Sequence, residues 1–120
     1  MQRDPLVIEP GELRHPIVIQ APDYTAEDAR GKSAVPASWI DVRSTRAMIY
    51  TAGGRETSMA SQIVSQVSHV VKVRWTATPI KANFRVIFGG RVFTISYIEN
   101  VLERNRVLLL YCLEIDGGGL

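Results

Sequence analysis

Residues 84–115 constrain the fold more than any other part of the sequence. Two apolar runs flank Gly89-Gly90, and two adjacent glycines can adopt the positive φ angles that a type I′ or II′ hairpin turn requires. A third apolar run at 107–115 follows a longer, charged connection at 99–105. The pattern predicts three consecutive antiparallel strands that form the wall of a small barrel or sandwich.

The alternation of side chains assigns faces to these strands. Phe93, Ile95 and Tyr97 share one parity of the second strand, so we predict that all three face the core. The last strand, 107–115, is apolar at both parities. Such a strand is expected to be covered on both of its faces.

Three earlier segments, 15–20, 39–50 and 67–76, also alternate as strands do. In the longest of them the alternation slips by one residue between Ser44 and Arg46, which predicts a β-bulge at that point. The sum is about six strands with one short helix and a long loop. We therefore predict a mainly β fold, a small antiparallel β-barrel, with all 120 residues in a single domain.

Three segments stand outside these strands. The N-terminal arm, 1–10, contains an apolar run that docks either on the barrel or on a neighbouring chain. Residues 21–38 form a polar loop, and a loop of that length in a compact domain is usually functional or mobile. The glycine-rich residues 116–120 predict a flexible tail.

Segment 51–66 departs from the strand pattern and carries a second glycine pair, Gly53-Gly54. After these glycines, apolar side chains recur at helical spacing from Met59 to Val67, which predicts a helix of about three turns. Serine and threonine within it compete for the backbone and weaken that helix. Two interpretations follow: a movable gate, or a plug whose apolar side chains seal one end of the barrel.

Few residues are candidates for chemistry. One cysteine and two histidines are too few for a zinc site with closely spaced ligands, and no nucleophile or acid–base pair stands out. We predict no metal, no cofactor and no catalytic residue. Cys112 lies in an apolar strand and is expected to be buried, and His69 is expected to be a hydrogen-bonded core residue.

The composition also bears on the compartment. No apolar run approaches the roughly 18 residues of a membrane span, so we expect no membrane contact and no signal peptide. A single cysteine excludes an internal disulfide, and we expect the protein to be made in a reducing cytoplasm.

The net charge of +2 is too small to indicate nucleic-acid binding by itself. Basic residues nevertheless fall on or beside predicted strands, at Arg43, Arg46, Lys72, Arg74, Lys81, Arg85 and Arg91. They form a solvated outer face with interspersed carboxylates, or, where several share a face, they contact nucleic acid or an acidic partner. A monomeric nucleic-acid-binding barrel of the OB type is therefore an alternative function, which requires aromatic side chains on one strand face beside basic ones.

Several motifs, taken in their order and spacing, resemble those of one family. They are Gly11-x-Leu13-Arg14-His15, Trp39-x-Asp41-Val42, Gly54-Arg55-Glu56, His69-x-Val71-x-Val73-Arg74-Trp75, Arg85-Val86-x-Phe88-x-Gly90-Arg91 and Glu103-Arg104-Asn105-Arg106. Through them the chain resembles, from about Gly11 to Glu114, the phage head-tail joining proteins. These are also called head-closure or stopper proteins and occur in long-tailed phages and gene transfer agents. The chain departs from the family pattern by its longer N-terminus.

The resemblance implies a small β-barrel that assembles as a ring, typically of twelve copies, below the portal and adaptor of a filled capsid. Such a ring closes the DNA exit channel and provides the platform for the tail. The implied partners are further copies of the chain, the portal or adaptor ring above, and a tail-completion or tail protein below. Packaged double-stranded DNA is contacted without sequence specificity. The expected location is a virion or virion-like particle, reached from the host cytoplasm, and no enzyme activity is expected.

In that family a loop or short helix between the second and third strands points into the channel and acts as a gate. In this sequence the corresponding segment is 51–66. The candidate gate residues are Gly53, Gly54, Arg55, Glu56, Thr57, Ser58 and Met59. The candidate contacts with ring neighbours are Leu6, Val7, Ile8, Tyr24, Arg30 and Lys32.

Overall fold

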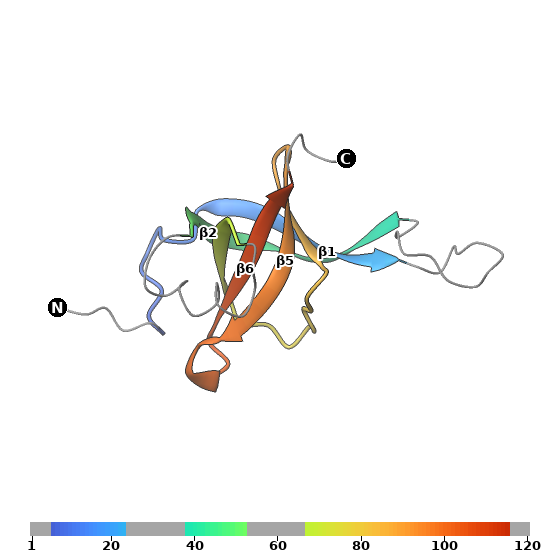
Figure 1. The fold of residues 1–120 in the computed structure, drawn as a ribbon. Coiled ribbons are helices and arrows are strands. Elements are labelled where there is room, and N and C mark those ends of the chain that lie inside the picture. The colour runs from blue at the N-terminus through green and yellow to red at the C-terminus, as the bar shows by residue number, and fades with distance from the viewer. Residues whose placement is uncertain (1–5, 24–37, 53–66, 116–120) are drawn as a thin grey trace.

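The computed structural model describes residues 6–23, 38–52 and 67–115. The described chain forms a closed antiparallel barrel with the strand order β1-β2-β3-β6-β5-β4 (Figure 1). In chain order the elements are β1 (His15–Asp23), β2 (Ser38–Thr51), β3 (His69–Arg74), β4 (Arg85–Phe88), β5 (Arg91–Asn100), the 3-10 helix η1 (Val101–Glu103) and β6 (Val107–Ile115). The predicted mainly β barrel of six strands is thus confirmed. The predicted short helix falls at 51–66, of which residues 53–66 lie outside the described ranges.

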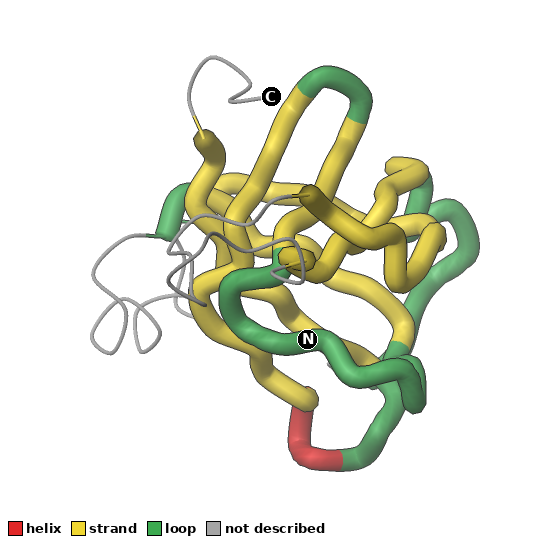
Figure 2. The backbone as a smooth tube through the Cα atoms, turned by 90° about the vertical axis from the view of Figure 1, so that its right-hand side faces the viewer, coloured by secondary structure: helices red, strands yellow, loops and turns green. Residues whose placement is uncertain are grey.

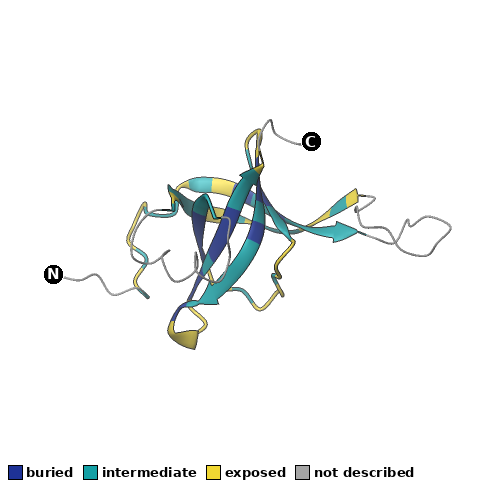
Figure 3. Cartoon of the chain, viewed as in Figure 1, coloured by how far each residue is buried: buried dark blue, intermediate teal, exposed yellow. Residues whose placement is uncertain are grey.

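The interior of the barrel is filled by one apolar cluster to which all six strands contribute. Its buried members are Ile17, Ile19, Ala47, Val71, Val73, Val86, Phe93, Ile95, Leu108, Leu110 and Cys112. Each large aliphatic or aromatic side chain removed from water in this way contributes about 1.5–3 kcal/mol to stability. Figure 3 shows the buried residues on the crossing strands and the exposed ones mostly on the connections.

The Gly89-Gly90 hairpin forms as predicted, with Phe88 paired to Arg91 across a two-residue turn. Only the first of the two glycines has a positive φ, +59° at Gly89, which is the pattern of a type II′ turn. A β-carbon added there would meet no atom within 4 Å. Glycine is therefore required at this position by its backbone conformation and not by lack of space.

A bulge in β5 corrects the predicted orientation of Tyr97. Ile95 pairs with Cys112 and Tyr97 with Tyr111, so Ser96 has no partner and the following side chains change face. Tyr97 packs with Val70 and Tyr111 in a second cluster on the outer face, and its ring lies 5.6 Å from that of Tyr111. The last strand is apolar at both parities because the interior cluster covers one face and this second cluster lies on the other.

The bulge predicted near Ser44 to Arg46 lies instead at Val42. Ile19 pairs with Arg43 and the next residue, Gln20, pairs with Asp41. The prediction was displaced because it used Ile40 as a marker of the inward parity. Ile40 lies beyond the barrel, where strands have no interior to face, and is 51% exposed.

The loop predicted at 21–38 is shorter than expected, because both strands continue past the barrel. Residues 20–23 pair with 38–41 in a two-stranded extension that we call the ribbon; it projects away from the barrel body (Figure 1). Pro22 lies within the ribbon as part of β1. A two-stranded ribbon has a free edge on each side, and proline is tolerated on an edge because it needs no donor there. Residues 24–37 lie outside the described part.

The helix η1 precedes β6 at one end of the barrel (Figure 2). With three residues it is far shorter than a membrane span, and among the described residues no helix is long and apolar enough to cross a bilayer.

Candidate functional site

The two ends of segment 53–66 are fixed side by side on the barrel. The backbone N–H of Ala52 donates to the carbonyl oxygen of Ser68 at 2.9 Å, and the Ser68 N–H donates to the carbonyl oxygen of Cys112 at 2.8 Å. Thr51 and His69 are paired as the last residues of the β2–β3 ladder. The segment therefore leaves and rejoins the barrel at one point. There Ser68 is hydrogen-bonded to Cys112 of β6.

Ser68 is held by its side chain as well as by its backbone. Its Oγ accepts a hydrogen bond from the Glu114 N–H at 2.8 Å and lies 2.9 Å from Nδ1 of His69. These contacts join the C-terminal end of the segment to the end of β6. Sequence reasoning missed Ser68 because its partners Ala52, Cys112 and Glu114 are all distant in sequence, so no local pattern marks it.

Arg91 and Glu114 form a two-bonded ion pair beside this point. Nε and Nη2 of Arg91 donate to the two carboxylate oxygens of Glu114 at 2.8 and 2.9 Å. The hydrogen bonds from Arg91 lower the pKa of Glu114, and they raise the pKa of Arg91. Because the carboxylate is held ionised, this pair is suited to positioning and not to proton transfer.

His69 completes what we call the polar cluster, defined as Ser68, His69, Arg91 and Glu114. Nε2 of His69 lies 4.0 Å from a Glu114 oxygen, and its ring packs edge-on against Phe93 at 5.2 Å. The prediction of a hydrogen-bonded core histidine is confirmed for its contacts, although the side chain is 15% exposed. The polar cluster joins the root of segment 53–66, the β4–β5 hairpin and the end of β6.

A second polar contact fastens the N-terminal turn to the outside of the barrel. Residues 9–14 turn tightly, with Glu12 N–H donating to the Glu9 carbonyl oxygen at 3.0 Å and Gly11 at a φ of +79°. The carboxylate of Glu12 lies 2.5 Å from Nζ of Lys72, with side-chain exposures of only 7% and 10%. The interpretation of Lys72 as part of a solvated face is therefore wrong, because the turn covers it.

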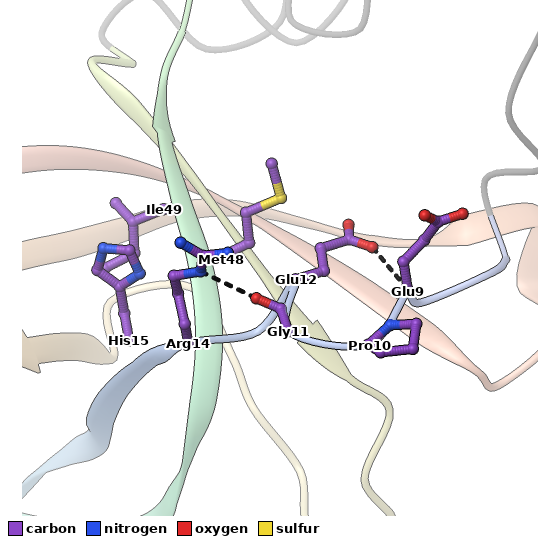
Figure 4. Close-up of a pocket in the computed structure, with 8 residues that line it drawn as sticks. All are labelled: Glu9, Pro10, Gly11, Glu12, Arg14, His15, Met48 and Ile49. Atoms are coloured by element: carbon purple, nitrogen blue, oxygen red, sulfur yellow. Dashed lines mark hydrogen bonds between the residues drawn. The ribbon is translucent and has the colours of Figure 1, made fainter.

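An open groove of about 410 Å³ lies between this turn and β2. Its lining residues are Glu9, Pro10, Gly11, Glu12, Arg14, His15, Met48 and Ile49 (Figure 4). Nδ1 of His15 is buried without a hydrogen-bond partner in the described structure, and the ring packs against Phe88 with 4.8 Å between centroids.

The other basic strand residues are separated and serve local contacts. Arg85 stacks over the ring of Trp39 at 4.1 Å and donates to Gln20 at 2.7 Å, which in turn donates to Asp41 at 2.8 Å. We call this chain of contacts at the base of the ribbon the brace. Arg43 donates to the carbonyl oxygen of Arg74 at 2.8 Å. Partial burial lowers the pKa of both Arg43 and Arg85.

A comparison with known protein families identifies one that matches nearly all of the described chain. A family model described as phage head completion protein matches residues 8–115. The chain belongs to this family. It therefore acts in phage head assembly as a structural component of the virion at the head–tail interface, in contact with other head and tail components. The resemblance to head-tail joining proteins is thus confirmed.

A solved structure shows the same fold. The solution structure of protein SF1141 from Shigella flexneri 2a is 22% identical and superimposes with a TM-score of 0.62, covering 92% of this chain and 99% of that one. No significant match was found among curated proteins.

The structure describes only some of the predicted site residues of this head completion protein. Val7 is 43% exposed, and Leu6 and Ile8 are partly buried. All seven candidate gate residues, 53–59, lie outside the described ranges, as do Tyr24, Arg30 and Lys32. Their roles remain predictions.

Two other sets of side chains bear on the chemistry of the described barrel. Within the described ranges, no three His, Cys, Asp or Glu side chains are grouped to hold a metal ion. The aromatic rings that an OB-type barrel would use for stacking are engaged in the fold: Phe93 is fully buried, Phe88 packs on the core, and Tyr97 packs on Tyr111.

Proposed function

We propose that the protein forms a ring below the portal or adaptor, closes the DNA exit channel of the filled head and provides the platform for tail attachment. Segment 53–66 is the element that closes the channel. The observation that carries the proposal is the hydrogen bond between Ala52 and Ser68, which places both ends of the segment at one point of a closed barrel. Membership of the head completion family supports it independently.

The length of the segment suits this role. Fifteen residues between the anchors Ala52 and Ser68 reach out and back by at most about 25 Å, at roughly 3.3 Å per residue. The polar cluster holds the anchors through Ser68 and Glu114, so both ends of the segment are fixed on the barrel. Arg55, together with small polar neighbours, contacts DNA phosphates without reading the sequence.

A loop replacement tests the gate against the plug. Because Ala52 and Ser68 are hydrogen-bonded neighbours, residues 53–67 can be exchanged for a two-residue Asn-Gly turn that closes directly between them. We expect a folded protein by circular dichroism, and filled heads that accept it but lose their DNA. A matched variant carries fourteen glycine and serine residues in place of 53–66, which keeps the length and removes the side chains.

The outcomes separate the interpretations. Heads that retain DNA with the Asn-Gly variant would refute closure by this segment. Loss of the folded barrel in both variants would instead identify the segment as a plug for the core. DNA loss with the short turn and retention with the glycine–serine segment would show that length alone closes the channel.

Ring formation requires specific contact surfaces on each subunit. A closed ring of identical copies uses heterologous contacts, so each copy must present two different, complementary faces. Electron microscopy of heads with and without the protein measures ring formation, DNA content and tails together. We expect heads without it to be empty and tailless.

A further inference from the structure

One end of the barrel is strongly basic and partly apolar. We define the basic end as residues 74–83 and 101–106, whose backbones meet where Trp75 N–H donates to the Arg106 carbonyl oxygen at 3.0 Å. It carries four exposed basic side chains, at Arg74, Lys81, Arg104 and Arg106, against one acidic side chain, Glu103. Trp75 is 36% exposed and Leu102 63% exposed. Within the described structure, none of the four basic side chains forms an ion pair.

The ribbon has the opposite character. Its two strands, residues 20–23 and 38–41, carry Asp23 and Asp41 and no basic residue, and they expose 51% of Ile40. Among the described residues its two strands have no further partner strand, because β1 pairs with β4 only as far as Gln20 and β2 pairs with β3 only from Met48. The brace fixes its direction through the Arg85 contacts to Trp39 and Gln20.

We propose that the ribbon of one copy docks on the basic end of the next copy, and that this is the head-to-tail contact of the ring. The proposal rests on the ring in the proposed function and specifies its two faces. The carboxylates of Asp23 and Asp41 meet a surface of charge +3, and Ile40 meets Trp75 and Leu102. The tip of the ribbon points away from η1 of its own chain (Figure 1). Two different faces on one chain generate a ring when the rotation between copies closes.

Duplex DNA is the other anion that a basic end could hold in a phage head. A duplex presents phosphates to a protein surface that has no sequence preference, and it offers no apolar partner to a leucine such as Leu102. The exposed apolar pair beside the arginines therefore favours a protein surface that is both acidic and apolar, as the ribbon is.

Charge exchange tests the contact. Asp41→Lys and Arg106→Glu each place like charges across the proposed contact, and we expect each to weaken incorporation into heads about tenfold or more. The combined variant Asp41→Lys/Arg106→Glu exchanges the signs and is expected to recover incorporation. Arg46→Glu, a charge reversal at an exposed position of β2 outside both the ribbon and the basic end, is the control and should incorporate normally. Incorporation is measured as protein bound per purified head.

A cross-linking experiment tests proximity directly. In heads carrying Ile40→Cys/Leu102→Cys, a short bismaleimide should produce a ladder of covalent oligomers, whereas either single variant should stop at dimers or fewer. The buried Cys112 is expected not to react.

The results distinguish this inference from the proposed ring. Rings that form normally with both single reversals and yield no ladder would overturn the docking contact and leave the ring intact. No ring with the native chain would remove the proposed function itself. If Arg106→Glu reduces DNA retention while Asp41→Lys has no effect, the basic end holds DNA and the inference is wrong.

Discussion

The buried ion pair between Glu12 and Lys72 offers a quantitative test of how the N-terminal turn is held. Replacing Lys72 by Met keeps the apolar stem and removes the charge, so the Glu12 carboxylate, 7% exposed, loses its contact with the Lys72 ammonium. Breaking a buried pair in this way costs about 3–5 kcal/mol. We expect the lower end, about 3 kcal/mol, because the turn can lift away and rehydrate the carboxylate.

The reverse change is expected to be milder. In Glu12→Gln the long lysine stem can carry its ammonium toward solvent, so we expect a loss of about 1–2 kcal/mol. The double variant leaves no buried charge and should lose less than the two single variants together. The expected coupling energy is about 2–3 kcal/mol.

Urea denaturation of the four proteins, followed by circular dichroism, measures these values. At about 4 °C per kcal/mol, Lys72→Met should also lower Tm by roughly 12 °C. Lys81→Met removes an exposed lysine and serves as the control, with an expected change within about 0.5 kcal/mol. Trypsin should cleave after Arg14 faster in Lys72→Met. Single effects that add without coupling would refute the reasoning, since they would mean that the two charges do not depend on each other.

Three further predictions concern single positions. Burial raises the pKa of the Cys112 thiol, so a thiol reagent should label it slowly in the native protein and rapidly in denaturant; equal rates would contradict its burial. Because Arg91 lowers the pKa of Glu114 in the folded state, this carboxylate stabilises the fold above its unfolded pKa of about 4.3 and loses that effect as pH falls through the lower folded pKa. Lowering the pH from about 5 to about 3 should therefore reduce the free energy of unfolding of the native chain more than that of Glu114→Gln. Parallel curves of this free energy against pH would contradict the ion pair. Gly89→Ala places a β-carbon at a φ of +59° and should cost about 1–2 kcal/mol in denaturation experiments; the matched change Gly90→Ala should cost less.

Local patterns predicted those parts of the fold that depend on neighbours in sequence. The Gly89-Gly90 turn was predictable because a two-residue hairpin needs specific backbone angles at its centre. The inward positions of Ile17, Ile19 and Phe93 were predictable because strand side chains alternate. Tyr97 was assigned wrongly because a bulge in β5 changes the parity at a point that the sequence does not mark.

The candidate site was also predictable from the sequence only in part. Family motifs indicated the 51–66 segment, but nothing local indicated its support by Ser68 and Glu114, which are 46 residues apart. The sequence by itself determined a six-stranded barrel, its central hairpin and its membership of a structural phage family, because these depend on periodicity, turn chemistry and motif order. Only the tertiary structure decided that Lys72 is buried against Glu12 and that β1 and β2 extend beyond the barrel as an acidic ribbon. Ion pairs and free strand edges are set by which distant segments meet, and that is a property of the closed barrel.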